Sequence, residues 1–506
     1  MKATQAIQLG LVQYATSKPF ALHHEARSNV DRLAEEAVPL AKDLMSLSIE
    51  FGNAVDFFGD TQKPNLFSKQ LLQNVIDRSG TPAILRIGGN TQDRANFCET
   101  CTDTMATVVL NDPNDPKGTE AKNVTFNANL FRVLTENVPA GSPLIFGLNY
   151  RNDSLELAEG EIRAAFGNLD QSLVMAYELG NEVNLYGNYR PSDYDVNVYA
   201  RDMQEWIPAL AASGAEHDPK FQFPYFAGPQ LFRPDMTIAN LVKMGVPQSL
   251  PQIECLAIHG YPWDICSPQS AALVDIRKLL NHSETTGLLD KYSGEIKASK
   301  SLDKELHMGE TGSVACHGKD GVSNTLGAAL WELDYALSGS VAGINRFFFH
   351  MGKGDFYYSM WEPLPSPKSP IAHINPTYYT MLFVADLVAD LEEPRIAAVK
   401  EEDSAVHFAI YDGDKLEKLV LLNLGYFNET SGSERGIQKV DVGSLMGPGL
   451  GVRRLTGHHS DATTGVTWAG QSTDDSGKIV GEAQVENACG GYVTLFDSEA
   501  VIVERV

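Results

Sequence analysis

Two glutamates close short apolar segments that lie far apart in the chain. Glu182 follows the apolar run in Leu173–Asn184 (LVMAYELGNEVN), and Glu310 ends the segment Glu305–Glu310 (ELHMGE). Each run has the length and residue types of a buried strand. Two carboxyl groups at the ends of separate strands supply what glycoside hydrolysis needs, one proton donor and one nucleophile or base. Because the chain has 65 acidic residues, either glutamate alone reads as a surface residue, whereas the pair favours the catalytic interpretation.

Strand-like segments alternate with amphipathic helical segments through the first two thirds of the chain. Eight such repeats predict a (β/α)8 (TIM) barrel, whose catalytic groups lie at the C-terminal ends of its strands. An open doubly wound sheet is the alternative, but it normally carries a GxGxxG loop, a spacing that Gly88-Gly89-Asn90 lacks. The predicted strands are Leu44–Phe51, Ala83–Ile87, Leu144–Leu148, Leu173–Leu179, Gln222–Ala227, Cys255–His259, Glu305–Gly309 and Gly343–His350.

The pattern changes after Asn375-Pro376. One helix is predicted over Tyr378–Leu391, and short alternating strands separated by turns then follow, which is typical of an antiparallel β-sandwich. We therefore predict an N-terminal segment at 1–35, a catalytic barrel at 36–375 and a β-sandwich domain at 376–506. The predicted sandwich strands are Ala405–Tyr411, Lys418–Leu424, Gln438–Asp441, Gly451–Leu455, Gly465–Trp468, Gly491–Phe496 and Ala500–Glu504.

The composition of the 506 residues restricts the partners. A hydrophobic content of 43% and a charged content of 21% are ordinary for a globular protein. No apolar run approaches the length of a membrane span. The net charge of −25 argues against nucleic acid and anionic membranes as partners. We expect a carbohydrate partner and neither a cofactor nor a metal, and the sequence does not give the oligomeric state.

The cysteines and glycosylation sequons suggest a secreted protein. Cys98–Cys101 and Cys255–Cys266 are candidate local disulfides, because no second CxxC or His pair follows Cys98-Glu-Thr-Cys101 at zinc-ligand spacing. The N-terminus lacks the apolar core of a signal peptide, so if the protein is secreted, we expect its leader to have been removed from this chain. N-x-S/T sequons in polar, loop-like surroundings begin at Asn123, Asn152, Asn281 and Asn428.

Polar residues follow several of the predicted barrel strands, where they would converge on one cleft. Carboxylates and amides of this kind fix the orientation of sugar hydroxyls. Asn181 precedes the candidate acid and would hold the sugar 2-hydroxyl, a contact that strengthens at the transition state. The converging residues are Glu50, Asn90, Asn181, Glu182, Tyr261 and Glu310.

The sequence leaves several of these roles open. Tyr261 either donates its phenol to Glu310, which would keep that carboxylate ionised while a less solvated Glu182 stays protonated, or is a packed aromatic. His259 is expected to satisfy a hydrogen bond beneath the site, and the alternative is that it acts as a base. Arg86 is expected to neutralise Glu50 or Glu182.

Five segments together resemble glycoside hydrolase family 79, the heparanase and β-glucuronidase family of retaining glycosidases, and most closely its fungal secreted branch. They are LSIEFG, LRIGGNTQD, YELGNEVN, HGY and HMGETGS, in the order in which the family has them. The resemblance implies a barrel and a β-sandwich to which the N-terminal segment adds a strand. It also implies that Glu182 is the acid/base and Glu310 the nucleophile. Asn181, Tyr261, Glu50 and Asn90 match positions around the sugar in the −1 subsite.

One departure from the family concerns the sugar. Members that bind a uronic acid often carry Tyr-Gly-Gly shortly after the nucleophile, where this chain has Ala315-Cys316-His317 followed by Gly318. The uronate contact is then either rebuilt from His317, Gly318 and Tyr358 or lost, and the second family tyrosine is Tyr357 or Tyr358. The expected activity is a retaining exo-β-glucuronidase. The alternatives are a β-glycosidase for a neutral sugar and a carbohydrate-binding protein without turnover.

Overall fold

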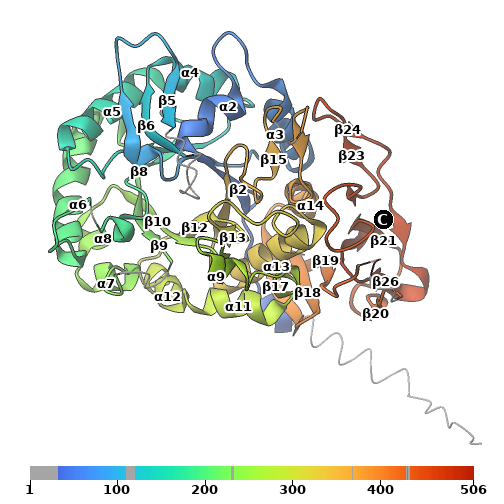
Figure 1. The fold of residues 1–506 in the computed structure, drawn as a ribbon. Coiled ribbons are helices and arrows are strands. Elements are labelled where there is room, and N and C mark those ends of the chain that lie inside the picture. The colour runs from blue at the N-terminus through green and yellow to red at the C-terminus, as the bar shows by residue number, and fades with distance from the viewer. Residues whose placement is uncertain are drawn as a thin grey trace, which may run out of the picture.

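The computed structural model describes residues 32–109, 120–187, 189–228, 233–366, 369–428, 430 and 434–506. Its larger part is a closed barrel of eight parallel strands (Figure 1), which confirms the predicted fold class. All eight predicted strands are present. In chain order they are β2 (Met45–Glu50), β3 (Leu85–Gly88), β7 (Leu144–Leu148), β8 (Val174–Leu179), β9 (Phe221–Ala227), β10 (Ile253–Gly260), β12 (Leu306–Thr311) and β14 (Arg346–Met351).

Helices surround the barrel and bury their apolar faces against it. In α3 (Leu66–Ser79), for example, Leu71, Leu72 and Val75 are buried, and the Asn65 side chain caps the first turn by accepting from the Ser68 N–H. Such a cap satisfies one of the backbone donors left open at a helix start. The other helices include α2 (Ala54–Phe58), α4 (Asn129–Glu136), α5 (Leu155–Asn168), α6 (Val196–Ala212), α7 (Ile238–Lys243), α8 (Val246–Ser249), α9 (Pro268–Ala271), α10 (Ile276–Leu279), α11 (His282–Asp290) and α12 (Ser293–Ser301).

Small sheets rise from the loops at the C-terminal end of the barrel. The largest was not predicted and lies between β3 and β7, with β6 (Ala121–Phe126) between β4 (Ala95–Phe97) and β5 (Met105–Val109). Asn123 lies within β6 and is therefore not in a loop. The smaller pairs are β11 (Trp263–Asp264) with β13 (Val314–Ala315) and β15 (Trp361–Glu362) with β16 (His373–Ile374).

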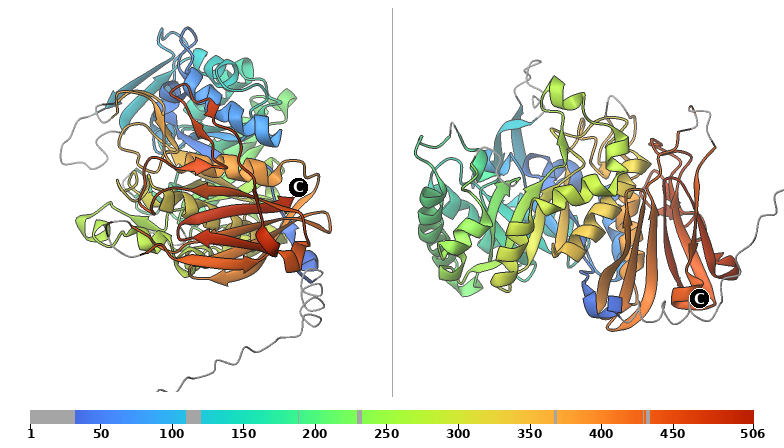
Figure 2. Two further views of the ribbon diagram at one scale, coloured as in Figure 1. Left: turned by 90° about the vertical axis from the view of Figure 1, so that its right-hand side faces the viewer. Right: turned by 90° about the horizontal axis from the view of Figure 1, so that it is seen from below.

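An antiparallel sheet stands beside the barrel and forms the C-terminal domain (Figure 2). Successive side chains along its strands face two different cores. Ala500 and Ile502 face the large core shared with the barrel, while Val501 and Val503 face a second, smaller core. Side chains on a strand point alternately to its two faces, so this sheet is the middle layer. Its order is β1 (Val38–Pro39), β17 (Pro394–Glu402), β18 (Ala405–Asp412), β19 (Lys415–Asn423), β27 (Glu499–Arg505), β21 (Leu450–Thr456) and β22 (Thr467–Trp468).

A short pair of strands, β20 (Ile437–Asp441) and β26 (Tyr492–Phe496), is the second layer of the sandwich. Val493 and Leu495 of β26 belong to the smaller core. On the opposite face of the main sheet lie α13 (Leu326–Ala342) and α14 (Tyr378–Val388). Because α13 packs against both the barrel and β17, nearly all of its side chains are buried, as expected for a helix that is apolar on all sides.

One sequence prediction is wrong, and another falls largely outside the described residues. The N-terminal segment 1–35 was predicted to add a strand to the sheet, and residues 1–31 of it lie outside the described residues. The strand β1 joins the sheet just after this segment, at Val38–Pro39. The predicted Cys255–Cys266 disulfide is wrong. Cys255 is buried in the barrel wall, whereas Cys266 lies in a loop and pairs with Cys316. Cys98 and Cys101 are joined as predicted. None of the described helices is long and apolar enough to span a membrane.

Candidate active site

The two glutamates meet at the C-terminal end of the barrel. Glu182 follows β8 and Glu310 lies in β12. One carboxylate oxygen of each and a ring nitrogen of His259 all lie within 4.8 Å of one another. Glu310 is buried, whereas the side chain of Glu182 is 18% exposed. The barrel therefore brings the two carboxylates together, with the less buried Glu182 nearer to solvent.

Arg86 of β3 holds Glu310 in place from inside the barrel. Its Nη1 donates to Glu310 Oε2 at 2.8 Å, and its Nε donates to Glu178 Oε2 at 2.7 Å. The remaining donors reach Ser48 Oγ at 2.7 Å and Asn181 Oδ1 at 2.9 Å. Arg86 thus neutralises Glu178 and Glu310, which corrects the expectation that it pairs with Glu50 or Glu182. The reason is that Glu178, on β8, also points into the barrel interior.

The surrounding positive charges keep Glu310 ionised. Burial alone would raise the pKa of its carboxyl, but His350, His259 and Arg86 outweigh burial and hold that pKa well below the usual value of 4.5. Glu178 and Glu310 raise the pKa of Arg86 against the opposing effect of burial. An opposite charge within a few ångströms favours the charged form of each partner. The carboxylate form of Glu310 is thus favoured by its surroundings.

Tyr261 contacts the other oxygen of Glu310. Its hydroxyl donates to Glu310 Oε1 at 2.9 Å, which is the contact expected from the sequence. Burial and the Glu310 charge raise the pKa of the Tyr261 phenol well above its usual value, and Tyr358 is raised for the same two reasons. The two tyrosine rings lie 5.9 Å apart. Both therefore remain neutral hydrogen-bond donors beside the carboxylate.

The loop that carries Glu182 has an unusual backbone conformation. Glu182 has φ = +48°, a left-handed value that is uncommon for a residue other than glycine and is often found at functional sites. Neighbouring contacts fix the loop. The side chain of Asn184 both donates to the Ala227 carbonyl and accepts from the Ala227 N–H, each at 2.8 Å. His259 Nδ1 lies 3.4 Å from Glu182 Oε1, so His259 belongs to the site itself rather than lying beneath it.

Asp93 orients Asn181 from below. Its Oδ2 accepts from the Asn181 N–H at 3.0 Å and from the Tyr186 hydroxyl. Burial raises the pKa of Asp93. The Asn181 side chain is held between Arg86, from which its Oδ1 accepts, and Asn90, to which its Nδ2 donates at 3.4 Å. Asn181 is consequently fixed in place before any substrate arrives.

Glu50 lies one histidine away from Glu310. Its Oε2 is 3.3 Å from His350 Nε2, and His350 Nδ1 is 3.7 Å from Glu310 Oε2. Burial would lower the pKa of His350, but Glu310 and Glu50 raise it overall. Gly89 makes room for Glu50, since a Cβ there would lie 2.8 Å from Glu50 Oε2 and its φ is +84°. This explains the Gly-Gly-Asn sequence that did not fit a phosphate loop.

The residues expected to contact a uronate lie in two loops, His317 and Gly318 after β12 and Tyr358 after β14. His317 stacks on Phe356 with ring centroids 3.9 Å apart, and its Nε2 lies 3.2 Å from Glu120 Oε1. The neighbouring Cys316 is tied to Cys266. Gly318 has φ = +80°, and its N–H donates to the Val314 carbonyl. His317 and Tyr358 are therefore the groups of this set whose side chains can donate to a ligand.

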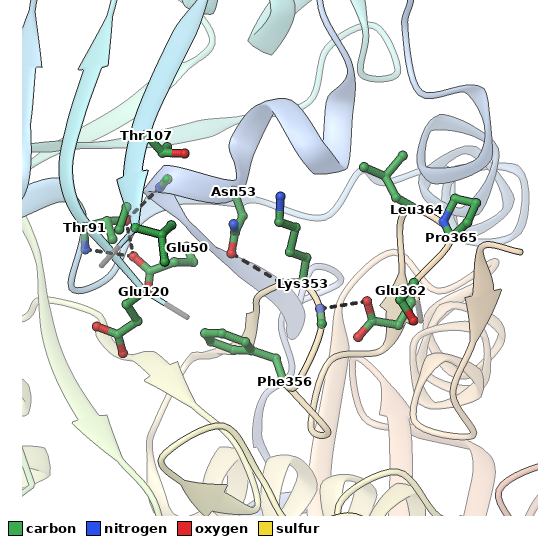
Figure 3. Close-up of a pocket in the computed structure, with 15 residues that line it drawn as sticks. Glu50, Asn53, Thr91, Thr107, Glu120, Lys353, Phe356, Glu362, Leu364 and Pro365 are labelled. Atoms are coloured by element: carbon green, nitrogen blue, oxygen red, sulfur yellow. Dashed lines mark hydrogen bonds between the residues drawn. The ribbon is translucent and has the colours of Figure 1, made fainter. Parts of the chain in front are cut away.

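Glu50 also lines a cavity of about 370 Å³ (Figure 3). Glu50, Thr91 and Glu120 lie at one end, Leu364 and Pro365 lie at the other, and Lys353 and Phe356 lie between them. Glu182 and Glu310 are not part of its lining. The cavity thus adjoins the catalytic centre and does not contain it.

Sequence reasoning missed several residues of the site. Glu178 and His350 are titratable residues within otherwise apolar strands. A titratable residue in such a strand is a sequence signal that could have identified both as site residues. Glu120 gave no such signal, because it follows the stretch 110–119, which lies outside the described residues, in a part of the chain where no element was predicted. The site residues that were not predicted are Ser48, Asp93, Glu120, Glu178, Asn184 and His350.

Comparison with known proteins agrees with this geometry. The model of the glycosyl hydrolase family 79 C-terminal β domain matches residues 407–502. The β-glucuronidase of Aspergillus niger is 28% identical, over 92% of this chain and 90% of its own length. The β-glucuronidase of Neurospora crassa gives the same three values.

Solved structures of other glycosidases share the fold. A 4-O-α-L-rhamnosyl-β-D-glucuronidase from Fusarium oxysporum, solved with Rha-GlcA, superposes with a TM-score of 0.79 at 24% identity, covering 92% of this chain and 97% of that one. A family 51 α-L-arabinofuranosidase from Bifidobacterium longum gives a TM-score of 0.61 at 13% identity, covering 93% and 98%. These likenesses concern the barrel and the adjoining sheet together.

Proposed function

We propose that this chain, a glycoside hydrolase of family 79, removes terminal β-linked glucuronic acid, or its 4-O-methyl form, with retention of configuration. One observation carries the retaining mechanism: carboxylate oxygens of Glu182 and Glu310 lie within 4.8 Å of each other. Retaining pairs stand about 5–5.5 Å apart, whereas inverting pairs stand about 6.5–9.5 Å apart because a water must fit between them. The short separation supports direct attack by Glu310.

The reaction proceeds in two displacements. Glu310, ionised by its contact with Arg86, attacks the anomeric carbon while Glu182 gives its proton to the departing glycosidic oxygen. Water then adds to the anomeric carbon, Glu182 takes the proton of that water, and the bond to Glu310 breaks. Asn181 holds the 2-hydroxyl through both steps. Because the Asn181 side chain is already fixed, it does not have to be ordered at the transition state.

The anomer that is released first tests retention. We expect NMR of a nitrophenyl β-glucuronide digest to show the β-anomer of glucuronic acid before mutarotation. Release of the α-anomer would contradict the double displacement. The variant Glu284→Gln, which alters an exposed glutamate in the first turn of α11, is the matched control for substitutions of Glu310.

Glucuronate as the sugar rests on two supports. The fungal relatives are β-glucuronidases, and the family resemblance implies that His317 and Tyr358 could rebuild the contact with the uronate carboxylate. For a protein of net charge −25, local donors of this kind are required, since the overall field repels an anion. We therefore assign the carboxylate contact to His317 and Tyr358 and not to the Gly318 amide, which donates to Val314.

A neutral sugar is the second candidate. It is favoured by Glu120, a buried carboxylate 3.2 Å from His317, which would repel a uronate placed against the same imidazole. A panel of nitrophenyl β-glycosides decides between the two. Turnover of the glucuronide at a kcat/KM well above those of the glucoside, galactoside and xyloside is expected, and the reverse order would transfer the assignment to a neutral sugar.

We also propose that the enzyme acts outside the cell on glycans or glycosides. The two disulfides, Cys98–Cys101 and Cys266–Cys316, belong to oxidising compartments, and Asn123 and Asn152 expose their sequons to solvent. Peptide mapping of protein from the native source is expected to show both disulfides and glycans on these two asparagines. Free thiols at all four cysteines would contradict this location.

A further inference from the structure

Three consecutive residues in the loop after β12 have a backbone conformation that favours glycine. Cys316, His317 and Gly318 have φ values of +63°, +78° and +80°, and residues with a side chain rarely adopt such left-handed values. A run of this kind persists only where the surrounding structure holds it in place. The position of the His317 side chain therefore depends on the contacts that fix this run.

The loop after β14 fixes one side of the run. The Tyr357 N–H donates to the His317 carbonyl at 2.6 Å, and the Phe356 ring stacks on the His317 imidazole. The two loops are so close that a Cβ on Gly318 would lie 2.7 Å from the Tyr358 backbone nitrogen. A shift of His317 would therefore also displace Tyr358, the second residue assigned to the uronate carboxylate.

The Cys266–Cys316 disulfide fixes the other side of the run. The short strands β11 and β13 pair in parallel, and this pairing ends with Asp264 opposite Ala315. Ala315 is the residue before the left-handed run begins. Beyond it, the disulfide connects the loop after β11 to Cys316, the first residue of the run. The link thus acts on the residue directly before His317, while its other end, Cys266, is exposed at the surface.

We infer that the Cys266–Cys316 disulfide determines specificity by positioning His317 and, through it, Tyr358 against the carboxylate of the sugar. The two cysteines act through His317 and need no contact of their own with the substrate. Without the disulfide, Cys316 and His317 are free to relax to ordinary φ values, which moves the imidazole away from its place. The inference rests on the proposed glucuronidase activity and adds the residues that set its preference for a charged group at C6.

The disulfide is expected to affect substrate binding and not the chemical steps. Glu310 keeps its contact with Arg86 at 2.8 Å, and Glu182 keeps its contact with His259 at 3.4 Å, because none of these residues lies in the two linked loops. The β11–β13 pair also remains when the disulfide is absent. A purely structural disulfide would instead affect all substrates equally.

Two substrates that differ only at C6 separate these possibilities: a nitrophenyl β-glucuronide and the corresponding glucuronamide, which carries no charge. We expect the wild-type enzyme to have the lower KM for the glucuronide. In Cys266→Ala/Cys316→Ala, the KM for the glucuronide is expected to rise about tenfold or more, as for the loss of a hydrogen bond to a charged group. The KM for the amide and kcat for both substrates are expected to stay within about twofold.

Two further variants serve as controls. Cys98→Ala/Cys101→Ala removes the other disulfide, which joins residues three apart between β4 and β5, and is expected to keep the wild-type KM for both substrates. Cys266→Ala/Cys316→Gly also lacks the Cys266–Cys316 link, but glycine adopts a φ of +63° without steric cost. Its KM for the glucuronide is therefore expected to lie clearly below that of the double alanine variant.

The outcomes separate the inference from the proposed function. Equal losses on the two substrates, an unchanged KM for the glucuronide, or a glycine variant no better than the alanine variant would overturn the positioning role and leave the glucuronidase assignment standing. A wild-type enzyme that prefers the amide would contradict the proposed function and the inference with it. All kinetics are measured well below the lowest melting temperature of the set, so that lost stability does not imitate lost binding.

Discussion

The chain contains two buried networks of arginines and carboxylates that differ in their balance of charge. At the boundary between barrel and sheet, Asp386 of α14 accepts from Arg78 at 2.6 Å, from Trp468 at 2.6 Å and from Arg453 at 3.0 Å. One carboxylate there meets two arginines, and Arg453 also donates to Glu504 at 3.0 Å. Each carboxylate of that network is therefore paired with an arginine, and the network joins the barrel to the C-terminal sheet.

At the candidate active site, carboxylates outnumber arginines. One arginine, Arg86, is shared between the carboxylates of Glu178 and Glu310. Two further carboxylates lie close by: Glu50 contacts His350, and Glu182 contacts His259. A surplus of carboxylates is costly inside a protein, and it persists here at the open end of a barrel. The comparison indicates that a network with enough arginines for its carboxylates stabilises the fold, while a network with an excess of carboxylates leaves carboxyl groups available for catalysis. Substitutions in the two networks should therefore separate activity from stability.

The largest expected effect is on activity alone. Glu310→Gln keeps the shape and the contact with Arg86 but removes the nucleophilic oxygen, so kcat is expected to fall by about 10⁴-fold or more. The thermal midpoint should change much less than in a variant that removes Arg86, because the amide oxygen still accepts from Arg86. Steady-state kinetics on a nitrophenyl β-glucuronide and a thermal melt measure both quantities. Retained turnover would remove Glu310 from the mechanism.

Arg86→Met is expected to affect both quantities. It leaves Glu178 and Glu310 buried without their cation, which costs about 3–5 kcal/mol of unfolding free energy. It also raises the pKa of Glu310, whose low value depends on His350, His259 and Arg86. Below that raised pKa the nucleophile is protonated, so the acidic limb of the kcat/KM profile moves to higher pH.

Urea unfolding and a pH profile of Arg86→Met measure these two effects, and Arg86→Lys is the control that keeps the charge. The sign follows from linkage: a lowered native pKa adds stability above about pH 4.5, and that stability is lost as the pH falls through the native pKa. An acidic limb that stays in place in Arg86→Met would contradict the role of Arg86.

Asp386→Asn should show the opposite pattern to Glu310→Gln. Removing the Asp386 carboxylate takes away the anion that Arg78 and Arg453 share, while Arg453 keeps its contact with Glu504, and this is expected to lower the unfolding free energy by about 3 kcal/mol. The site lies on the other side of the barrel wall, so kcat/KM at 25 °C is expected to stay within about twofold, as is usual for distant, independent sites. A large loss of kcat/KM with unchanged stability would mean that the two networks are not separate.

The smallest effect is expected from Tyr261→Phe. This change removes one hydrogen bond to the Glu310 carboxylate, and such charged bonds are worth about 1.5–3 kcal/mol. The corresponding fall in kcat/KM is about 10- to 100-fold. Tyr292→Phe is the matched control, because Tyr292 is also buried but donates to the His259 carbonyl instead. Equal losses in the two variants would assign Tyr261 to packing only.

The sequence predicted the strands that carry this site better than the contacts between its side chains. Apolar runs with the spacing of strands placed all eight barrel strands, and the family resemblance identified the two glutamates. Periodicity carries no information on which charged side chains meet across a barrel, so the partners of Arg86 were assigned wrongly. The Cys266–Cys316 disulfide joins residues 50 apart in sequence, and it too depends on tertiary structure. The sheet β4–β6–β5, which supplies Glu120, is an insertion that the alternating pattern does not predict.

The covalent intermediate on Glu310 is the central claim, and it can be trapped. A 2-deoxy-2-fluoro β-glucuronosyl fluoride slows both displacements by destabilising the cation-like transition states, but its good leaving group lets the first one proceed. Intact-protein mass spectrometry is expected to show one added fluoroglucuronosyl group, and peptide mapping is expected to place it on Glu310. An adduct on any other residue, or rapid loss of fluoride without an adduct on the protein, would contradict the account.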